Sequence, residues 1–323
     1  MKIQGSRKNA FYILISFIII ISVILLIVLN SLFGKQYPEE PIKMKNLGKS
    51  TQQIDISTLS KKIEKEDIPV YSVEPKLHIS NVEEMIDKMG LSLKREDLVK
   101  DSYVVWSDGE NSFTYDSIQD TVSFQLTRRV SLERGVEAFK NIFQKYLGIE
   151  NEYVLIKERK NIDGGITYYA SRTLEGLPIQ FGASYEYSEI LKFNKEGVLE
   201  SGQLLLAEFE KYDLYVPTIT NDELKAYINM KDYPKEHFID SSVLADTLDL
   251  YYLDEGWAEI EETLDECKAQ DFENIFLFKN SNQGYLLPVI KISANCNVTS
   301  GGTVYTVPAN FYVNGVSPDY VTL

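Results

Sequence analysis

Carboxylates that could act as acids or bases, or bind a cation, gather in one stretch near the end of the chain. A glycoside hydrolase needs two carboxylates roughly 5–10 Å apart in a cleft, one of them with a pKa raised by apolar surroundings. Only Trp257 could provide such a wall nearby. We interpret the stretch as a solvent-exposed face, with loose calcium binding or envelope hydrolysis as alternatives. Its acids are Asp254, Glu255, Glu259, Glu261, Glu262, Asp265, Glu266, Asp271 and Glu273.

No other residue pattern indicates catalysis or a cofactor. The two histidines, His78 and His237, have no partner ligands at useful spacing, and HExxH, CxxC and EF-hand motifs are absent. We interpret both as surface residues. Gly301-Gly302 lacks the Lys-Ser/Thr of a phosphate-binding loop, and the segment 182–186 lacks the last Gly of a nucleophile elbow. The sequence therefore predicts a protein that is not an enzyme and has no cofactor or metal.

Cys267 and Cys296 are the only cysteines. A bridge between them would close a loop of about 30 residues and stabilise the fold by about 3.5 kcal/mol in the chain-entropy model. Their position near one another and beyond the apolar N-terminal segment favours pairing, and two free thiols are the alternative.

Aromatic residues are unusually frequent, with 21 Tyr and 15 Phe. Tyrosine suits a half-buried strand, where its ring packs and its hydroxyl reaches water. It is also enriched where proteins bind one another. The candidate interaction residues are Tyr185, Tyr187, Tyr212 and Tyr215, with packing within the sheets as the alternative.

An uncharged apolar run from Phe11 to Phe33 predicts a transmembrane helix. A helix of this length covers roughly 34 Å, enough to cross a hydrocarbon core. Lys2, Arg7 and Lys8 precede it, so residues 1–10 are expected in the cytoplasm and the large C-terminal part outside the cell. The alternative is a cleaved signal peptide, whose apolar core is usually shorter.

Beyond residue 33 the chain is strongly acidic. All 48 Asp and Glu lie there with 33 − 3 = 30 Lys and Arg, so this part carries 30 − 48 = −18 charges. Nucleic-acid binding needs a basic surface, so this class of partner is excluded. The expected partners are the lipid bilayer, through one helix, and a membrane or envelope protein.

The pattern of apolar residues predicts an α+β fold in two units. Residues 34–75 have few apolar positions and are expected to form a linker. Residues 76–218 and 219–323 are expected to form packed α+β units with antiparallel meanders, so that residues 76–323 should fold alone. Helices are predicted at the capping boxes that begin at Ser80 and Thr220, and over residues 131–147, where Gly148 ends the helix. Strands are predicted where apolar residues alternate, through Phe113 and Tyr115 and through Val122, Phe124 and Leu126, and over Tyr153–Glu158.

One stretch of the first unit resembles PepSY-type domains. It reads Glu175-Gly176-Leu177-Pro178-Ile179, followed by the strand and turn of residues 190–198. With the predicted transmembrane helix in front, the chain is similar to the YycH and YycI family. This resemblance implies a membrane-anchored extracytoplasmic regulator of a cell-wall-sensing histidine kinase. The expected function is therefore non-enzymatic regulation or scaffolding, with an extracellular ligand-, calcium- or wall-polymer-binding module as the alternative.

Overall fold

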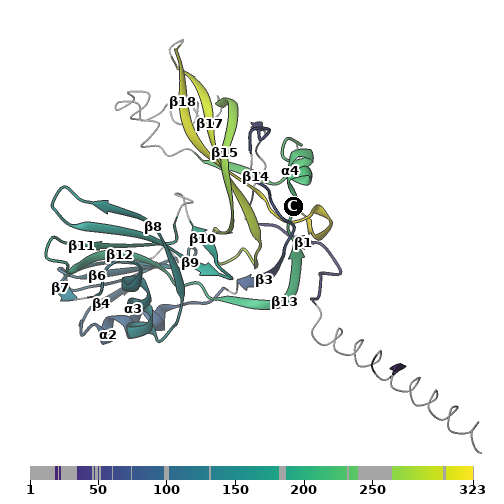
Figure 1. Ribbon diagram of the computed structural model, residues 1–323. Coiled ribbons are helices and arrows are strands. Elements are labelled where there is room, and N and C mark those ends of the chain that lie inside the picture. The colour runs from purple at the N-terminus through teal and green to yellow at the C-terminus, as the bar shows by residue number, and fades with distance from the viewer. Residues whose placement is uncertain are drawn as a thin grey trace, which may run out of the picture.

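The computed structural model describes residues 19–20, 22, 35–45, 47, 50, 52–59, 61–73, 75–97, 102–130, 132–181, 187–230, 233–238, 264–300 and 303–322. Strands make up 52% of these residues, and the helices are few. The α+β prediction is therefore wrong, because the fold is mostly β (Figure 1). The amphipathic helices that suggested α+β are short coverings on an extensive sheet.

The helices are α2 (Ile79–Lys88), α3 (Val136–Leu147) and α4 (Asn221–Tyr227), with a 3-10 turn over Pro318–Tyr320. The strands are β1 (Ile42–Lys43), β2 (Ile54–Asp55), β3 (Asp67–Val73), β4 (Lys94–Asp97), β5 (Tyr103–Ser107), β6 (Ser112–Asp116), β7 (Thr121–Val130), β8 (Glu152–Lys160), β9 (Ile166–Leu174), β10 (Leu177–Phe181), β11 (Glu189–Phe193), β12 (Leu199–Leu205), β13 (Phe209–Pro217), β14 (Lys235–Phe238), β15 (Leu264–Phe278), β16 (Tyr285–Leu286), β17 (Pro288–Ser300), β18 (Thr303–Asn314) and β19 (Val321–Thr322).

The first unit is an antiparallel sheet covered by α2 and α3 on one face, here called the helix-covered sheet (Figure 1). Its strand order is β8-β9-β11-β12-β7-β6-β5-β4. The predicted alternation in β6 and β7 is confirmed, since Phe113, Tyr115, Val122 and Phe124 are buried. These side chains share one core with the apolar faces of both helices. The opposite face of the sheet is polar and is called the open face below.

The second unit is the C-terminal sheet, with strand order β14-β18-β17-β15 and α4 beside it. β10 joins the two units, because it pairs antiparallel with β9 and parallel with β15. The whole forms one branched sheet of 14 strands in the described part of the chain. A smaller sheet, β13-β3-β16, lies at the junction.

Residues 34–75, which we expected to form a linker, are built into the fold. β2 pairs with β15, β1 with β19, and β3 is the central strand of the small sheet. The linker expectation failed because it was based on apolar density, whereas the few apolar residues of this segment are distributed over three hydrophobic clusters of the fold. The buried side chains are Ile42, Met44, Leu47, Ile54, Ile56, Ile63, Ile68, Val70, Tyr71 and Val73.

The first residues of the helices differ from the sequence prediction in two of three cases. The capping box at Thr220 is confirmed, since its side chain accepts from the Glu223 amide and Glu223 accepts from the Thr220 amide. The box at Ser80 is wrong, because the N-cap of α2 is His78, two residues earlier, and makes no side-chain capping hydrogen bond. The helix predicted from residue 131 begins at Val136, while its predicted end at Gly148 is confirmed, with φ +70°.

None of the helices in the described ranges combines the length and the apolar composition that a membrane span requires. The predicted span Phe11–Phe33 lies outside the described residues, apart from Ile19, Ile20 and Ser22, which are helical.

Candidate functional site

The acidic stretch does not form a carboxylate pair in the described part of the chain. Residues 254–263 lie outside it, and the other four acids lie exposed along β15. Glu266 accepts a hydrogen bond from Asn297, Asp271 lies 3.8 Å from Lys61, and Glu273 lies 3.1 Å from Lys291. No group of three or more His, Cys, Asp or Glu side chains that could hold a metal occurs among the described residues.

Cys267 and Cys296 form a disulfide between β15 and β17. The ladder between these strands is irregular from Asp265 to Lys268, and Cys267 lies within this irregularity. Both cysteines are buried, and Cys267 also pairs in the parallel ladder with Ile54 of β2. The bridge therefore fixes the place where the N-terminal segment joins the C-terminal sheet.

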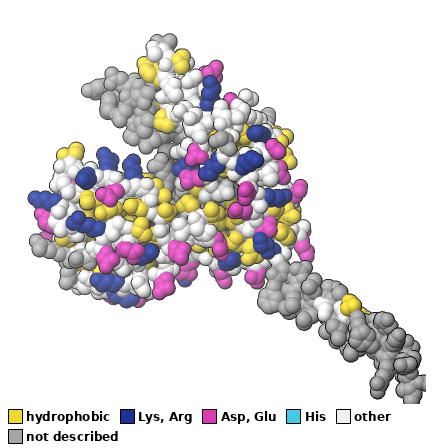
Figure 2. All heavy atoms as spheres, in the orientation of Figure 1, with side chains coloured by type: hydrophobic (Ala, Val, Ile, Leu, Met, Phe, Trp, Pro, Cys, Tyr) yellow, Lys and Arg dark blue, Asp and Glu magenta, His cyan; other side chains and the backbone are white. Residues whose placement is uncertain are grey.

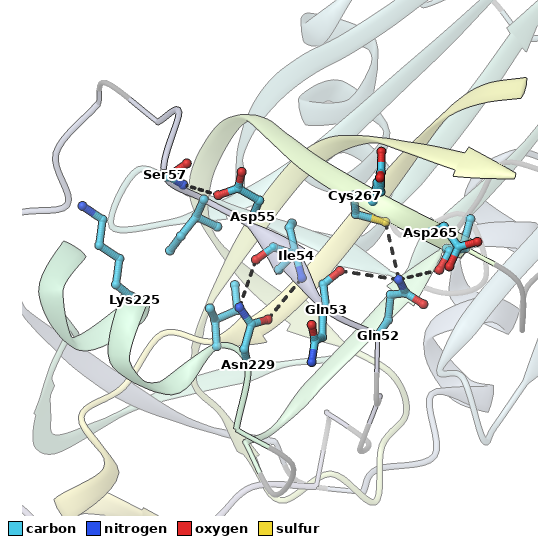
Figure 3. Close-up of a pocket in the computed structure, with 13 residues that line it drawn as sticks. Gln52, Gln53, Ile54, Asp55, Ser57, Lys225, Asn229, Asp265 and Cys267 are labelled. Atoms are coloured by element: carbon cyan, nitrogen blue, oxygen red, sulfur yellow. Dashed lines mark hydrogen bonds between the residues drawn. The ribbon is translucent and has the colours of Figure 1, made fainter. Parts of the chain in front are cut away.

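A cavity of about 850 Å³ lies beside this disulfide (Figure 3). It is lined by β2 with its flanking residues, the end of α4, and the beginning of β15. Asn229 donates to the Ile54 carbonyl at 3.2 Å and accepts from the Ile54 amide at 3.1 Å, as a neighbouring strand would. Gln52 donates to the Leu264 carbonyl at 2.8 Å.

Gln52, Asn229 and Asp55 thus bind neighbouring backbone groups rather than converge on an empty point. Asp55 accepts from the Ser57 amide at 2.8 Å, and this hydrogen bond lowers the pKa of its carboxyl. A general acid would need the opposite shift. We interpret the cavity as the seat of β2 on the C-terminal sheet.

The histidines differ from their predicted surface position. His78 is 1% exposed, and its Nε2 lies 3.3 Å from Oδ2 of Asp120, which is also 1% exposed. Tyr115 donates to the other Asp120 oxygen at 2.8 Å and accepts from the His78 amide at 3.1 Å. His237 is half-buried and lies 3.0 Å from the Ser50 hydroxyl. The His78–Asp120 pair holds the start of α2 against the sheet.

A second cluster of buried polar side chains, formed by Arg172, Glu189 and Tyr153, lies under the start of β8. Arg172 lies between the rings of Phe143 and Phe209 and donates to the Leu205 and Ala207 carbonyls. Its guanidinium is 3.5 Å from Glu189, which also accepts from Tyr153 at 3.3 Å. Complete burial raises the pKa of the Glu189 carboxyl to about 7, although Arg172 acts to lower it. Each of these groups serves the packing of the helix-covered sheet.

The candidate tyrosines do not come together in one place. Tyr185 lies outside the described residues. Tyr187 lies 4.7 Å from the ring of Tyr169 in the helix-covered sheet. Tyr212 of β13 meets Tyr285 of β16 at 6.3 Å. Tyr215, three residues further along β13, belongs to a different group.

This group, called the Tyr215 cluster, consists of Lys35, Tyr37, Asp67, Tyr215 and Tyr320. The Lys35 ammonium lies 5.4 Å from the centre of the Tyr215 ring and 3.1 Å from Asp67. Tyr37 donates to the same Asp67 oxygen at 3.1 Å, a hydrogen bond that raises the pKa of its phenol, and its ring is 5.9 Å from that of Tyr320. The Tyr215 amide donates to the Gln36 carbonyl at 2.7 Å, which joins the cluster to β13.

Sequence reasoning identified the β8 strand but missed its position at an edge. β8 pairs with β9 on one side, and no described strand pairs with its other side. Eight of its nine residues are exposed, among them Val154, Leu155 and Ile156 at 39%, 37% and 39%. Three consecutive exposed aliphatic residues were the available signal, since a buried strand would alternate.

No protein-family model matches the chain, and no curated protein is significantly similar to it. Among solved structures, it is similar to the crystal structure of an uncharacterized protein from Eubacterium rectale, with 11% identity and a TM-score of 0.40. The match covers 80% of this chain and 85% of that chain. A similarity this distant carries no argument about function, so the resemblance to PepSY domains and to the YycH and YycI family stays a prediction.

Proposed function

We propose that this chain is a membrane-anchored extracytoplasmic protein of the regulatory or scaffold type, which binds another membrane or envelope protein. The observation that carries the proposal is the position of the Tyr215 cluster. Lys35 and Tyr37 belong to it, and they follow within a few residues on the predicted span Phe11–Phe33. Two residues of extended chain reach about 7 Å, so the cluster would stand close to the outer surface of the bilayer.

The chemistry of the cluster suits contact with a protein. Its tyrosines offer flat apolar rings with a polar end, and Tyr37 is 41% exposed. Tyr is enriched at binding hot spots, where a few anchors provide most of the binding energy. The cation of Lys35 lies over the Tyr215 ring and also pairs with Asp67, so the ring is already oriented before a partner arrives, and less entropy is lost on binding.

Site-specific photo-crosslinking in native membranes tests this proposal. We expect a photoreactive phenylalanine in place of Tyr37 to capture a membrane protein. The change Tyr215→Ala should lower the yield by about 30-fold or more, as for an anchor that contributes ~2–4 kcal/mol. The matched control is the same reagent at Tyr103, which is 43% exposed on β5 of the helix-covered sheet. Equal capture of that protein from Tyr103, or an unchanged yield with Tyr215→Ala, would contradict the proposal.

The membrane part of the proposal has its own test. Alkaline phosphatase fused after Leu323 should be active, because the enzyme works only outside the cytoplasm. Activity restricted to a cytoplasmic reporter at the same position would show that Lys2, Arg7 and Lys8 do not set the orientation as expected. Residues 35–323, exported on a cleavable signal peptide, should fold but give much less crosslinking, because the partner is met in the plane of the membrane.

A further inference from the structure

We propose that the outer edge of β8 binds an extended, acidic segment of a protein, which adds a strand to the helix-covered sheet. The inference rests on the proposed function as a protein-binding domain and names a second surface and the chemistry of the segment that it takes. Strand addition to an exposed edge is a common mode of peptide recognition, in which backbone hydrogen bonds give affinity and side chains give specificity.

The backbone of β8 offers a long template. Its nine residues include no proline and extend over about 30 Å, and their outward amides and carbonyls have no strand partner in the described part of the chain. The only irregularity in its pairing with β9 lies between Leu155 and Lys157. Exposed edges are usually protected by charges or bulges. Both occur here. Because the charges of β8 repel segments with charges of the same sign, only a segment of complementary charge should pair with this edge.

The basic half of β8 specifies that charge. The register places Lys157 opposite Tyr169 and Arg159 opposite Thr167 on the open face of the sheet. In the described part of the chain, neither cation is in an ion pair, although the whole protein carries a net charge of −15. Figure 2 shows several Lys and Arg side chains along the upper margin of the lobe that contains this sheet. An added strand with carboxylates opposite Lys157 and Arg159 would pair both cations.

The apolar half specifies the rest of the segment. Val154 shares the open face with these two cations, while Leu155 lies on the opposite face and Ile156 occupies the irregular position. Their exposure leaves apolar area that an added strand would cover. The expected occupant is therefore an extended segment with two acids at alternate positions and aliphatic residues next to them. The ring of Tyr169, opposite Lys157 on β9, packs against Tyr187 one strand in from this edge.

A designed peptide tests the inference directly with the full-length protein in detergent micelles. The probe is a fluorescein-labelled nine-residue strand with Glu opposite Lys157 and Arg159 and Val opposite Val154 and Leu155. In fluorescence anisotropy it should bind about tenfold or more tightly than the same peptide with Lys in place of Glu, because two favourable cross-strand pairs become repulsive. Hydrogen exchange should slow at the outward amides of β8.

Charge exchange provides the matched controls. The double change Lys157→Glu with Arg159→Glu should reverse the preference, so that the Lys peptide binds better. Lys94→Glu, at the exposed edge strand β4 on the other end of the sheet, should change nothing. Both variants alter exposed side chains, so folding should be retained.

Three results would overturn the inference. They are equal binding of both peptides, unchanged exchange of the β8 amides, and a concentration-dependent dimer that the charge reversal abolishes, which would make a second copy the occupant. Loss of peptide binding with intact crosslinking from Tyr37 would remove only this inference. Loss of crosslinking with intact peptide binding would remove the proposed function of the Tyr215 cluster instead.

Discussion

The helix-covered sheet and the C-terminal sheet are stabilised in different ways. In the first, buried polar pairs join elements of the same unit, as in the pairs His78–Asp120 and Arg172–Glu189. In the second, a disulfide joins β15 to β17, and a distant N-terminal segment lies against β15. These polar pairs of the first unit span at most 120 − 78 = 42 residues, whereas the second unit requires a segment that is more than 200 residues away, since Ile54 pairs with Cys267.

This difference extends to the surfaces that each region leaves for partners. β15 of the C-terminal sheet is flanked by β17, β10 and β2, so its backbone is used within the fold. Near the junction, Leu214 of β13 forms a β-bridge with Gln36. The groups that stay exposed there are aromatic side chains such as Tyr37 and Tyr212. The helix-covered sheet instead ends in β8, where the backbone itself is accessible. A partner would thus be recognised by side chains at one region and by strand addition at the other.

The largest effect is expected from removing the N-terminal segment. Residues 76–323 should show no cooperative thermal transition in the C-terminal sheet, contrary to our expectation from sequence. Ten buried apolar side chains would be lost, each worth about 1.5–3 kcal/mol when fully buried, against a typical total stability of about 5–15 kcal/mol. Circular dichroism of this fragment, compared with residues 35–323, provides the measurement. A single sharp transition in the shorter fragment would show that the two regions do not differ in this way.

Asp120→Ala should be the most damaging single change in the helix-covered sheet. It would leave the buried His78 ring and the Tyr115 hydroxyl without their common partner, and leaving a buried polar group unsatisfied costs about 1–3 kcal/mol for each group. The matched control is Glu83→Ala, which removes an exposed pair with Arg95 at 3.1 Å and should cost about 0–1 kcal/mol. Urea denaturation of both variants measures their losses in free energy of unfolding, and the loss should be larger for Asp120→Ala. Similar small costs would mean that this buried pair contributes little to the sheet.

The sequence predicted local elements better than their arrangement. Period-two alternation identified β6 and β7 correctly, and the Thr220 capping box identified α4, because both signals depend on neighbouring residues. The contact of Ile54 with Cys267 has no local signal, and so residues 34–75 looked like a linker. His78 looked like a surface residue for the same reason, since its partner Asp120 becomes adjacent only when α2 packs on the sheet.

The candidate surfaces show the same limit. Tyr212 and Tyr215 were identified by residue type, but nothing local indicates that Tyr215 meets Lys35 or that Tyr187 lies in the other unit. The strand that became β8 was visible in the sequence, whereas its edge position depends on the order of all strands in the sheet. Residue type therefore predicted candidate residues for binding. Only the arrangement of the strands shows that the Tyr215 cluster and the outer edge of β8 are two separate surfaces.

A smaller effect, which depends on pH, should also be confined to the helix-covered sheet. The pKa of the Glu189 carboxyl is raised to about 7 in the folded protein, against about 4.3 in an unfolded chain. Between these values the folded state binds more protons than the unfolded state, so the free energy of unfolding falls as pH rises. This group's contribution is complete below about pH 4 and is lost as pH rises through about 7.

Glu189→Gln should remove this dependence, because the amide does not ionise but can still accept from Tyr153 and Arg172. The stability of the variant relative to the wild type should therefore rise between pH 5 and 8, by at most about 1.4 kcal/mol per pH unit. Urea denaturation at several pH values measures the difference, with Glu200→Gln as the control, since Glu200 forms a partly exposed pair with Lys192 at 3.3 Å. Glu200→Gln should show no such change in relative stability with pH. The same pH trend in Glu200→Gln would show that the sensitivity does not arise from the buried Arg172–Glu189 pair under β8.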